Sequence, residues 1–118
     1  MKHEIKWLEF PEEHDYPAAL SYLSLFFDEP QAQALVDELR AAPMSAYKAK
    51  DIARASGLTL LGADNRHVTH NLKKIAADTA LSPLLLVRGE RLCVADGFHR
   101  LSAVYLLDED TVVPVKIV

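Results

Sequence analysis

The segment best suited to chemistry runs from Cys93 to Arg100, with the sequence Cys-Val-Ala-Asp-Gly-Phe-His-Arg. Its pattern predicts a strand, a glycine turn and the first turn of a helix. The first amides of a helix have no partner inside the helix, and the helix dipole adds positive potential, so such a turn can bind an anion. Gly97 leaves room for a ligand, while His99 and Arg100 add donors on the same turn. We therefore predict a phosphate or carboxylate site at these three residues.

A second group of potential cations lies on the helix that we expect from Arg66 to about Ala77. His67, His70 and Lys74 recur at i, i+3 and i+7, so they share one helix face beside the apolar stripe. If this face flanks the glycine turn, the two elements form one basic pocket on an acidic protein, which would attract an anionic ligand. The alternative is a solvated helix face that binds nothing.

Both features have simpler interpretations. Asp96 could cap the helix and occupy its free amides, with Arg100 paired to Asp96 four residues earlier. A metal site at His67, His70 and His99 is a further alternative, but no Cys or carboxylate at ligand spacing completes the four ligands of a structural zinc site. We therefore predict no metal site.

The sequence selects no catalytic residue. Cys93 lies between apolar residues of an expected strand, which favours a small buried side chain over an activated thiolate. Asp64, Glu90 and Asp96 are all candidate bases, and their positions do not distinguish them. Catalytic residues therefore remain unknown.

The first half of the chain is predicted to be helical. Asp15 and Pro17 are a helix start signal for a helix that reaches Phe27, and Asp28 with Pro30 repeats the signal for a second helix that stops at Ala42-Pro43. The short connection between them predicts a helical hairpin. A third helix is expected over 46–56, followed by Gly57 in the left-handed conformation.

The second half is predicted to be α/β. We expect a short strand or linker over 58–61, a helix over 66–77 capped by Asp64 or Asn65, and a helix over 98–107. The expected strands cover 84–88, 91–95 and 112–118, and Pro114 favours an edge position or a bulge in the last of them. The chain is thus predicted to be α+β, with a small mixed sheet preceded by the helical hairpin. Residues 1–57 are the helical extension and residues 58–118 the α/β module of one compact domain.

Composition excludes several classes of protein. A chain of 118 residues suits one domain, and 13 basic against 17 acidic side chains give a net charge of −4, which argues against a role based on binding nucleic acid phosphates. No apolar run reaches the roughly 18 residues of a membrane span, and the N-terminus lacks signal-peptide features. With a single cysteine, we expect a cytoplasmic protein without disulfides.

Three segments together resemble the ParB/sulfiredoxin superfamily, which includes the ParB-like nuclease domain. They are the apolar run that begins at Pro83, the Asp-Gly-Phe-His-Arg turn at 96–100, and Val-Pro-Val at 113–115. The resemblance covers about residues 64–118, and its mark is a Gly-x-x-Arg turn at a helix start.

The resemblance implies a ParB/sulfiredoxin-like fold in which this turn binds nucleotide phosphates. By position, His67, His70 and Lys74 would be the assisting side chains of the preceding helix. Mg²⁺ is expected if the ligand is a triphosphate.

The sequence also departs from the superfamily. Phe98 stands where sulfiredoxin has its catalytic cysteine, and Cys93 does not replace that cysteine, which argues against sulfinic acid reduction. ParB carries a helix-turn-helix domain after this module, and none is seen before Val118, which argues against a DNA-clamp role. The helical first half instead resembles a small bacterial group with the same helical lead and an Asp-Gly-Phe/Tyr-His-Arg turn.

These observations leave three functions open. The first is binding of a nucleotide or another small phosphorylated ligand at the Gly-x-x-Arg turn, with a small-molecule kinase or nucleotidase as a related enzyme. The second is a non-catalytic module that forms a homodimer or binds another protein through Tyr22, Leu25 and Phe26. The third is a DNA-associated accessory or nuclease-like protein, against which the net negative charge argues.

Overall fold

Strand β2 (Leu84–Val87) explains the layers of the fold, because its four apolar side chains are all buried. Successive side chains of a strand point to opposite faces of a sheet. Leu84 and Leu86 therefore pack into one core cluster, and Leu85 and Val87 pack into another. Both faces of the sheet are covered in this computed structural model, which describes residues 4–118.

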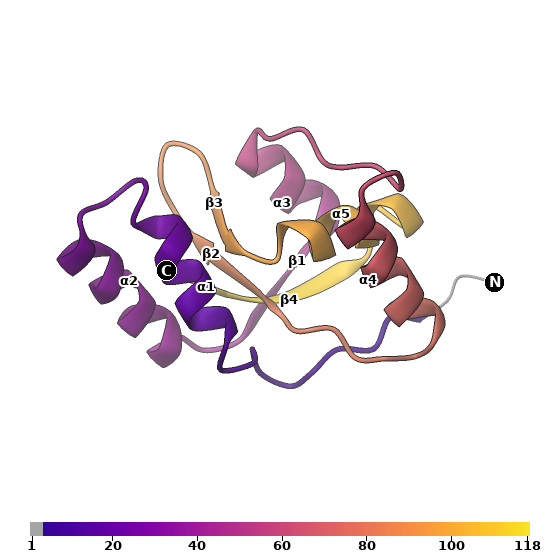
Figure 1. Ribbon diagram of the computed structural model, residues 1–118, viewed down its shortest axis with the longest axis horizontal. Coiled ribbons are helices and arrows are strands. Elements are labelled where there is room, and N and C mark those ends of the chain that lie inside the picture. The colour runs from indigo at the N-terminus through magenta and orange to yellow at the C-terminus, as the bar shows by residue number, and fades with distance from the viewer. Residues whose placement is uncertain (1–3) are drawn as a thin grey trace.

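The sheet has four strands in the order β1-β4-β2-β3, as Figure 1 shows. Strand β4 (Val112–Ile117) runs parallel to β2, while β1 (Ser45–Lys48) is antiparallel to β4 and β3 (Cys93–Asp96) is antiparallel to β2. The predicted α+β class with a small mixed sheet is confirmed.

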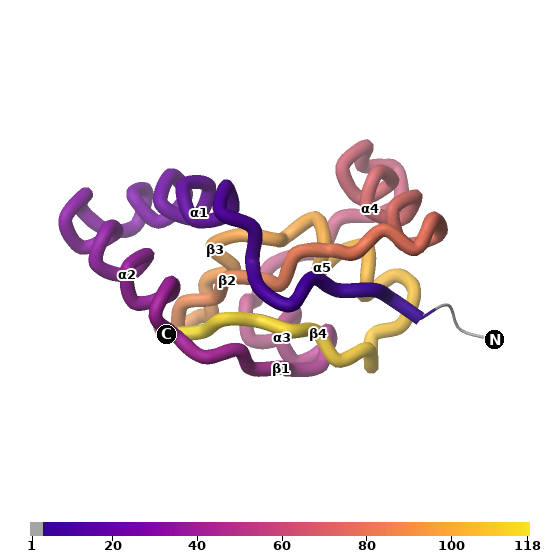
Figure 2. Tube along the Cα trace, turned by 90° about the horizontal axis from the view of Figure 1, so that it is seen from below, coloured from indigo at the N-terminus to yellow at the C-terminus, as the bar shows by residue number. Residues whose placement is uncertain are grey.

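Helices cover the two faces of the sheet. A hairpin of two helices packs against the Leu85 face and lies to the left of the sheet in Figure 1, and the other three helices pack against the Leu84 face. Figure 2 shows the same separation of the hairpin from α4 (Arg66–Ala76) and α5 (Phe98–Leu107). The helices are α1 (Asp15–Leu23), α2 (Glu29–Ala41), α3 (Ala49–Ser56), α4 (Arg66–Ala76) and α5 (Phe98–Leu107).

Three of the predicted helix ends are confirmed by their local geometry. The Asp28 carboxylate accepts a hydrogen bond from the Gln31 amide and caps α2. Asn65 caps α4 in the same way. Gly57 ends α3 with a left-handed φ of 66°. Helix α1 starts at Asp15 as predicted, but the Asp15 side chain is buried and does not cap it, and the helix ends at Leu23 instead of Phe27.

The third predicted helix is wrong in its first part. Residues 45–48 form β1, and the helix predicted over 46–56 begins only at Ala49, as α3. Residues 58–61 form no strand, and the strand expected over 91–95 begins only at Cys93, after a loop over 88–92. Strand β4 lies inside the sheet, contrary to the edge position that Pro114 suggested. Its parallel pairing with β2 begins only at Val115, so Pro114 has a partner only on β1.

No helix among residues 4–118 combines the length and the apolar character that a membrane crossing would need.

Candidate functional site

The turn from β3 into α5 is built around Gly97. Its φ is 103°, a left-handed conformation that side chains disfavour. A Cβ at this position would lie 2.8 Å from Leu84 Cγ and 2.9 Å from Arg100 Nη2. Glycine therefore lets the turn pack directly on β2, and no side chain among the described residues caps the first amides of α5.

Arg100 forms an ion pair with Asp96, one residue before the turn. Its Nη2 lies 2.9 Å from Asp96 Oδ2 and donates a second, longer hydrogen bond to the Pro83 carbonyl at 3.4 Å. The Nε of Arg100 is buried and has no hydrogen-bond partner within residues 4–118. The alternative interpretation from the sequence is thus half correct, because Asp96 pairs with Arg100 but does not cap α5.

A second carboxyl group, Asp15, joins this pair from α1. Asp15 is buried, and its Oδ2 accepts hydrogen bonds from Ser82 Oγ and from the Glu12 amide, the latter at 3.1 Å. It also interacts with Asp96 across the end of β3. Burial raises the pKa of Asp96, Arg100 opposes this rise, and Asp15 adds to it. This contact was missed because Asp15 matched a helix start signal and lies far from Asp96 in the sequence.

Two histidines, one from α4 and one from α5, are in contact at the same turn. The rings of His67 and His99 have centroids 4.8 Å apart. Burial lowers the pKa of His99, and His67 and Arg100 lower it further. The neutral imidazole is therefore favoured more than in free solution. Within the described part of the chain, no hydrogen bond, ion pair or ring contact joins His70 or Lys74 to this turn.

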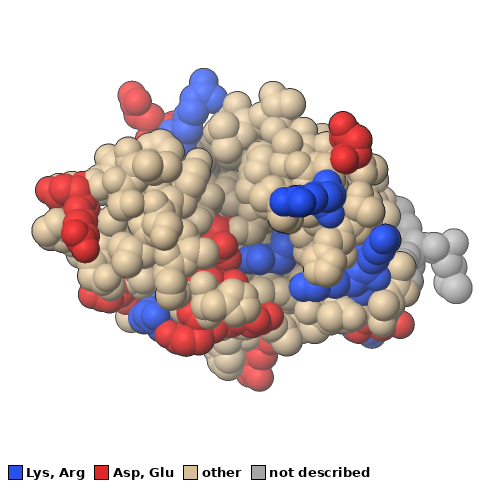
Figure 3. Space-filling view, viewed as in Figure 1, with Lys and Arg blue, Asp and Glu red and all other residues tan. Residues whose placement is uncertain are grey.

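A hollow of about 340 Å³ opens beside the turn. Figure 3 shows a hollow in the middle of this face, with a basic and an acidic group side by side on its floor and further Lys and Arg side chains over α4. The hollow has mainly apolar walls, with Tyr22, Asp96 and His99 as its polar side chains. Its lining residues are Tyr22, Leu58, Val94, Ala95, Asp96, Phe98 and His99.

The residues at this turn do not fit a protein-held magnesium ion. Among residues 4–118 no group of three or more His, Cys, Asp or Glu side chains could hold a metal ion. Asp96 is the carboxylate that lines the hollow, and it is already paired with Arg100. We therefore assign no role to a cation held by these side chains.

The fold and the turn define a small α+β protein with a strand-glycine-helix corner at an open hollow. Comparison with protein-family models, curated proteins and solved structures finds no significant match for this chain.

Proposed function

We propose that the protein binds a small phosphate-bearing ligand, a nucleotide or another phosphorylated molecule, at the first turn of α5. One observation carries the proposal: this turn opens beside the 340 Å³ hollow with its first amides uncapped by any described side chain. Free amides at a helix start are donors aimed at an anion. The Gly-x-x-Arg resemblance supports the same ligand.

The side chains around the turn have different roles in this proposal. His99 lines the hollow and donates to a phosphate oxygen, and His67 supports its ring from α4. Arg100 is held in an ion pair by Asp96, so the pair carries no net charge and the guanidinium is not a free bidentate donor for the ligand. His70 and Lys74 lie further along α4 and contribute only to the long-range potential.

Binding can be tested by calorimetry with inorganic sulfate, inorganic phosphate and ADP, the last with and without Mg²⁺. We expect His99→Ala to weaken sulfate and ADP binding about tenfold or more, because a hydrogen bond to a charged group is lost. His70→Ala is the matched control on the solvated part of α4, and we expect less than about a twofold effect. Absence of binding to the wild type at millimolar ligand would refute the proposal.

The pKa of His99 predicts a pH dependence for this site. Because burial lowers this pKa, His99 is mainly neutral near pH 7 and becomes cationic as the pH falls. Sulfate stays a dianion over this range, so its affinity should increase from pH 8 to pH 5.5 in the wild type. The increase should be smaller in His99→Gln. Equal slopes for the two proteins would show that His99 does not contact the anion.

A further inference from the structure

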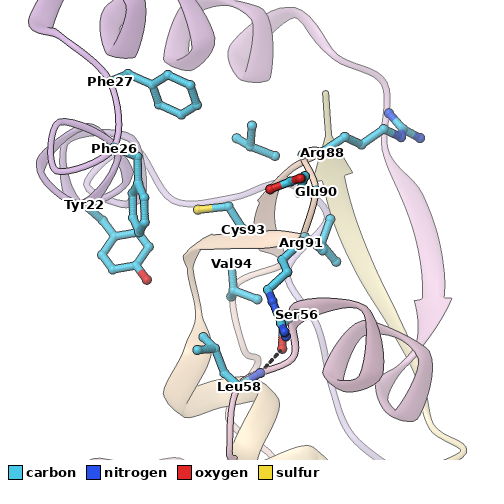
Figure 4. Close-up of a pocket in the computed structure, with 13 residues that line it drawn as sticks. Tyr22, Phe26, Phe27, Ser56, Leu58, Arg88, Glu90, Arg91, Cys93 and Val94 are labelled. Carbon is cyan, nitrogen blue, oxygen red and sulfur yellow. Dashed lines mark hydrogen bonds between the residues drawn. The ribbon is translucent and has the colours of Figure 1, made fainter.

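A larger groove of about 630 Å³ lies next to the hollow and has an aromatic wall. Tyr22, Phe26 and Phe27, from α1 and the turn after it, form one side, and Figure 4 shows them facing the β3 side of the groove. The rings of Tyr22 and Phe26 meet edge to face, with centroids 5.2 Å apart. The opposite side includes Leu58 and Val94. This volume and lining are typical of a small-molecule site.

The groove contains a cation without a partner. Arg91 lines it, and among the described residues its guanidinium has no hydrogen bond or ion pair. In Figure 4 the end of this side chain lies beside Ser56, at the base of the groove. Gly57 makes this position possible, since a Cβ there would lie 1.7 Å from Arg91 Nη1. The absence of a side chain at Gly57, at the end of α3, thus leaves space for the Arg91 guanidinium.

The other polar side chains of the groove do not neutralise Arg91. The Ser56 hydroxyl donates to the Ala53 carbonyl at 2.8 Å and accepts from the Leu58 amide at 3.3 Å. Burial raises the pKa of the Cys93 thiol, which therefore stays protonated near neutral pH. Glu90 is exposed on the loop between β2 and β3 and forms no ion pair with Arg91.

We propose that this groove binds a small carboxylate with an apolar, aromatic-sized body. The carboxylate meets the fork of Arg91, which can bind both of its oxygens, and the apolar body packs against Tyr22 and Phe26. The site is separate from the phosphate site, because Arg91 lines only the groove and His99 lines only the hollow. The two cavities share Tyr22, Leu58 and Val94 as lining residues, so their ligands would be neighbours.

The probe for this proposal is 2-naphthoate, measured by calorimetry. Acetate carries the charge without the apolar body, and 2-naphthylmethanol carries the body without the charge. We expect 2-naphthoate to bind about tenfold tighter than either comparator, because it uses both the guanidinium and the aromatic wall. Similar affinities for 2-naphthoate and 2-naphthylmethanol would overturn the proposal, since Arg91 would then contribute nothing.

Variants of the two arginines make the test specific. Arg91→Met keeps the alkyl part of the side chain and should weaken 2-naphthoate about tenfold or more, while changing 2-naphthylmethanol less than about twofold. Arg88 also lines the groove, but its side chain points away from the aromatic wall in Figure 4. Arg88→Met removes the same charge and should change neither affinity by more than about twofold. Equal effects of the two substitutions would refute a specific contact with Arg91.

Light scattering on the same samples tests whether a second copy of the chain occupies the groove instead of a small molecule. Phe26 is 61 % exposed, so a second copy of the chain is the other way to cover the aromatic wall. A dimer that Phe26→Ser dissociates, together with no binding of 2-naphthoate, would overturn the proposal. A monomer that binds 2-naphthoate independently of sulfate would support it, even if the phosphate site proved wrong.

Discussion

At the scale of the residue, the pKa of Asp96 is set by the groups around its carboxyl group. Its carboxylate ends a buried strand, pairs with Arg100 and faces the buried Asp15. Burial and Asp15 favour its protonated form, and Arg100 favours the ionised form. Because burial is the largest cause, the pKa of Asp96 is higher in the folded protein than in the unfolded chain.

This shift predicts a pH dependence of stability. A carboxyl group with a raised pKa contributes stability that is complete below its unfolded pKa and is lost as the pH rises through its folded pKa. The free energy of unfolding of the wild type, relative to Asp96→Asn, should therefore decrease as the pH rises above the ordinary aspartate pKa of about 3.9 toward neutrality. Urea titrations at several pH values measure this difference. Glu38→Gln removes the same charge from an exposed position and corrects for general charge effects. If the difference in unfolding free energy between the wild type and Asp96→Asn did not change with pH, the prediction would be contradicted.

At the scale of the element, Gly97 determines how α5 starts. Gly97 combines a left-handed φ with a close approach to Leu84 and to the Arg100 guanidinium. Helix α5 can therefore start immediately after β3 and place its first turn against β2. A side chain at this position would have to displace its neighbours as well as adopt a disfavoured conformation.

We expect Gly97→Ala to lower the free energy of unfolding by about 1–3 kcal/mol, from backbone strain and displaced neighbours. The matched control is Gly62→Ala, where φ is not left-handed and the nearest atom to a new Cβ is Asp64 Oδ1 at 3.0 Å. That side chain is exposed and can move, so the control should cost less than about 0.5 kcal/mol. Chemical denaturation measures both values, and similar costs would show that the conformation of Gly97 is unimportant.

The whole molecule depends on helices at both faces of the sheet. The α1–α2 hairpin covers Leu85, Val87 and Ala95, which would otherwise be exposed. The first half also supplies β1, the antiparallel neighbour of β4. At the end of β4, the buried Lys116 donates from its Nζ to the carbonyl of Arg40, the penultimate residue of α2, at 2.7 Å. Residues 4–57 and 58–118 therefore share cores and a sheet.

A chain of residues 58–118 alone should not fold. It would expose the Leu85 face of the sheet to water and leave β4 without β1, and such a short chain buries too little apolar surface to compensate. Circular dichroism with heating is the measurement, and the full chain is its reference. A cooperative thermal transition of the fragment would contradict this prediction and show that the α/β module is independent.

The elements that were predicted well depend on neighbours in the sequence. Asp28 and Asn65 cap their helices as expected, the apolar run in β2 is a buried strand, and Gly97 begins α5. Each depends on hydrogen bonds, side-chain periodicity or backbone preference within a few residues. Strand β1 was missed because its side chains are mostly exposed and its extended conformation comes from pairing with β4.

The α+β class, most of the helices and the strand-glycine-helix turn could thus be predicted from residue patterns alone. Packing of the complete chain was needed to bring Asp15 to Asp96, His67 to His99, and Arg91 over Gly57 beside an aromatic wall. These partners lie far apart in the sequence. Local rules act over one or two helical turns, whereas most of these contacts join residues that are brought together only when the sheet and its two helical layers pack.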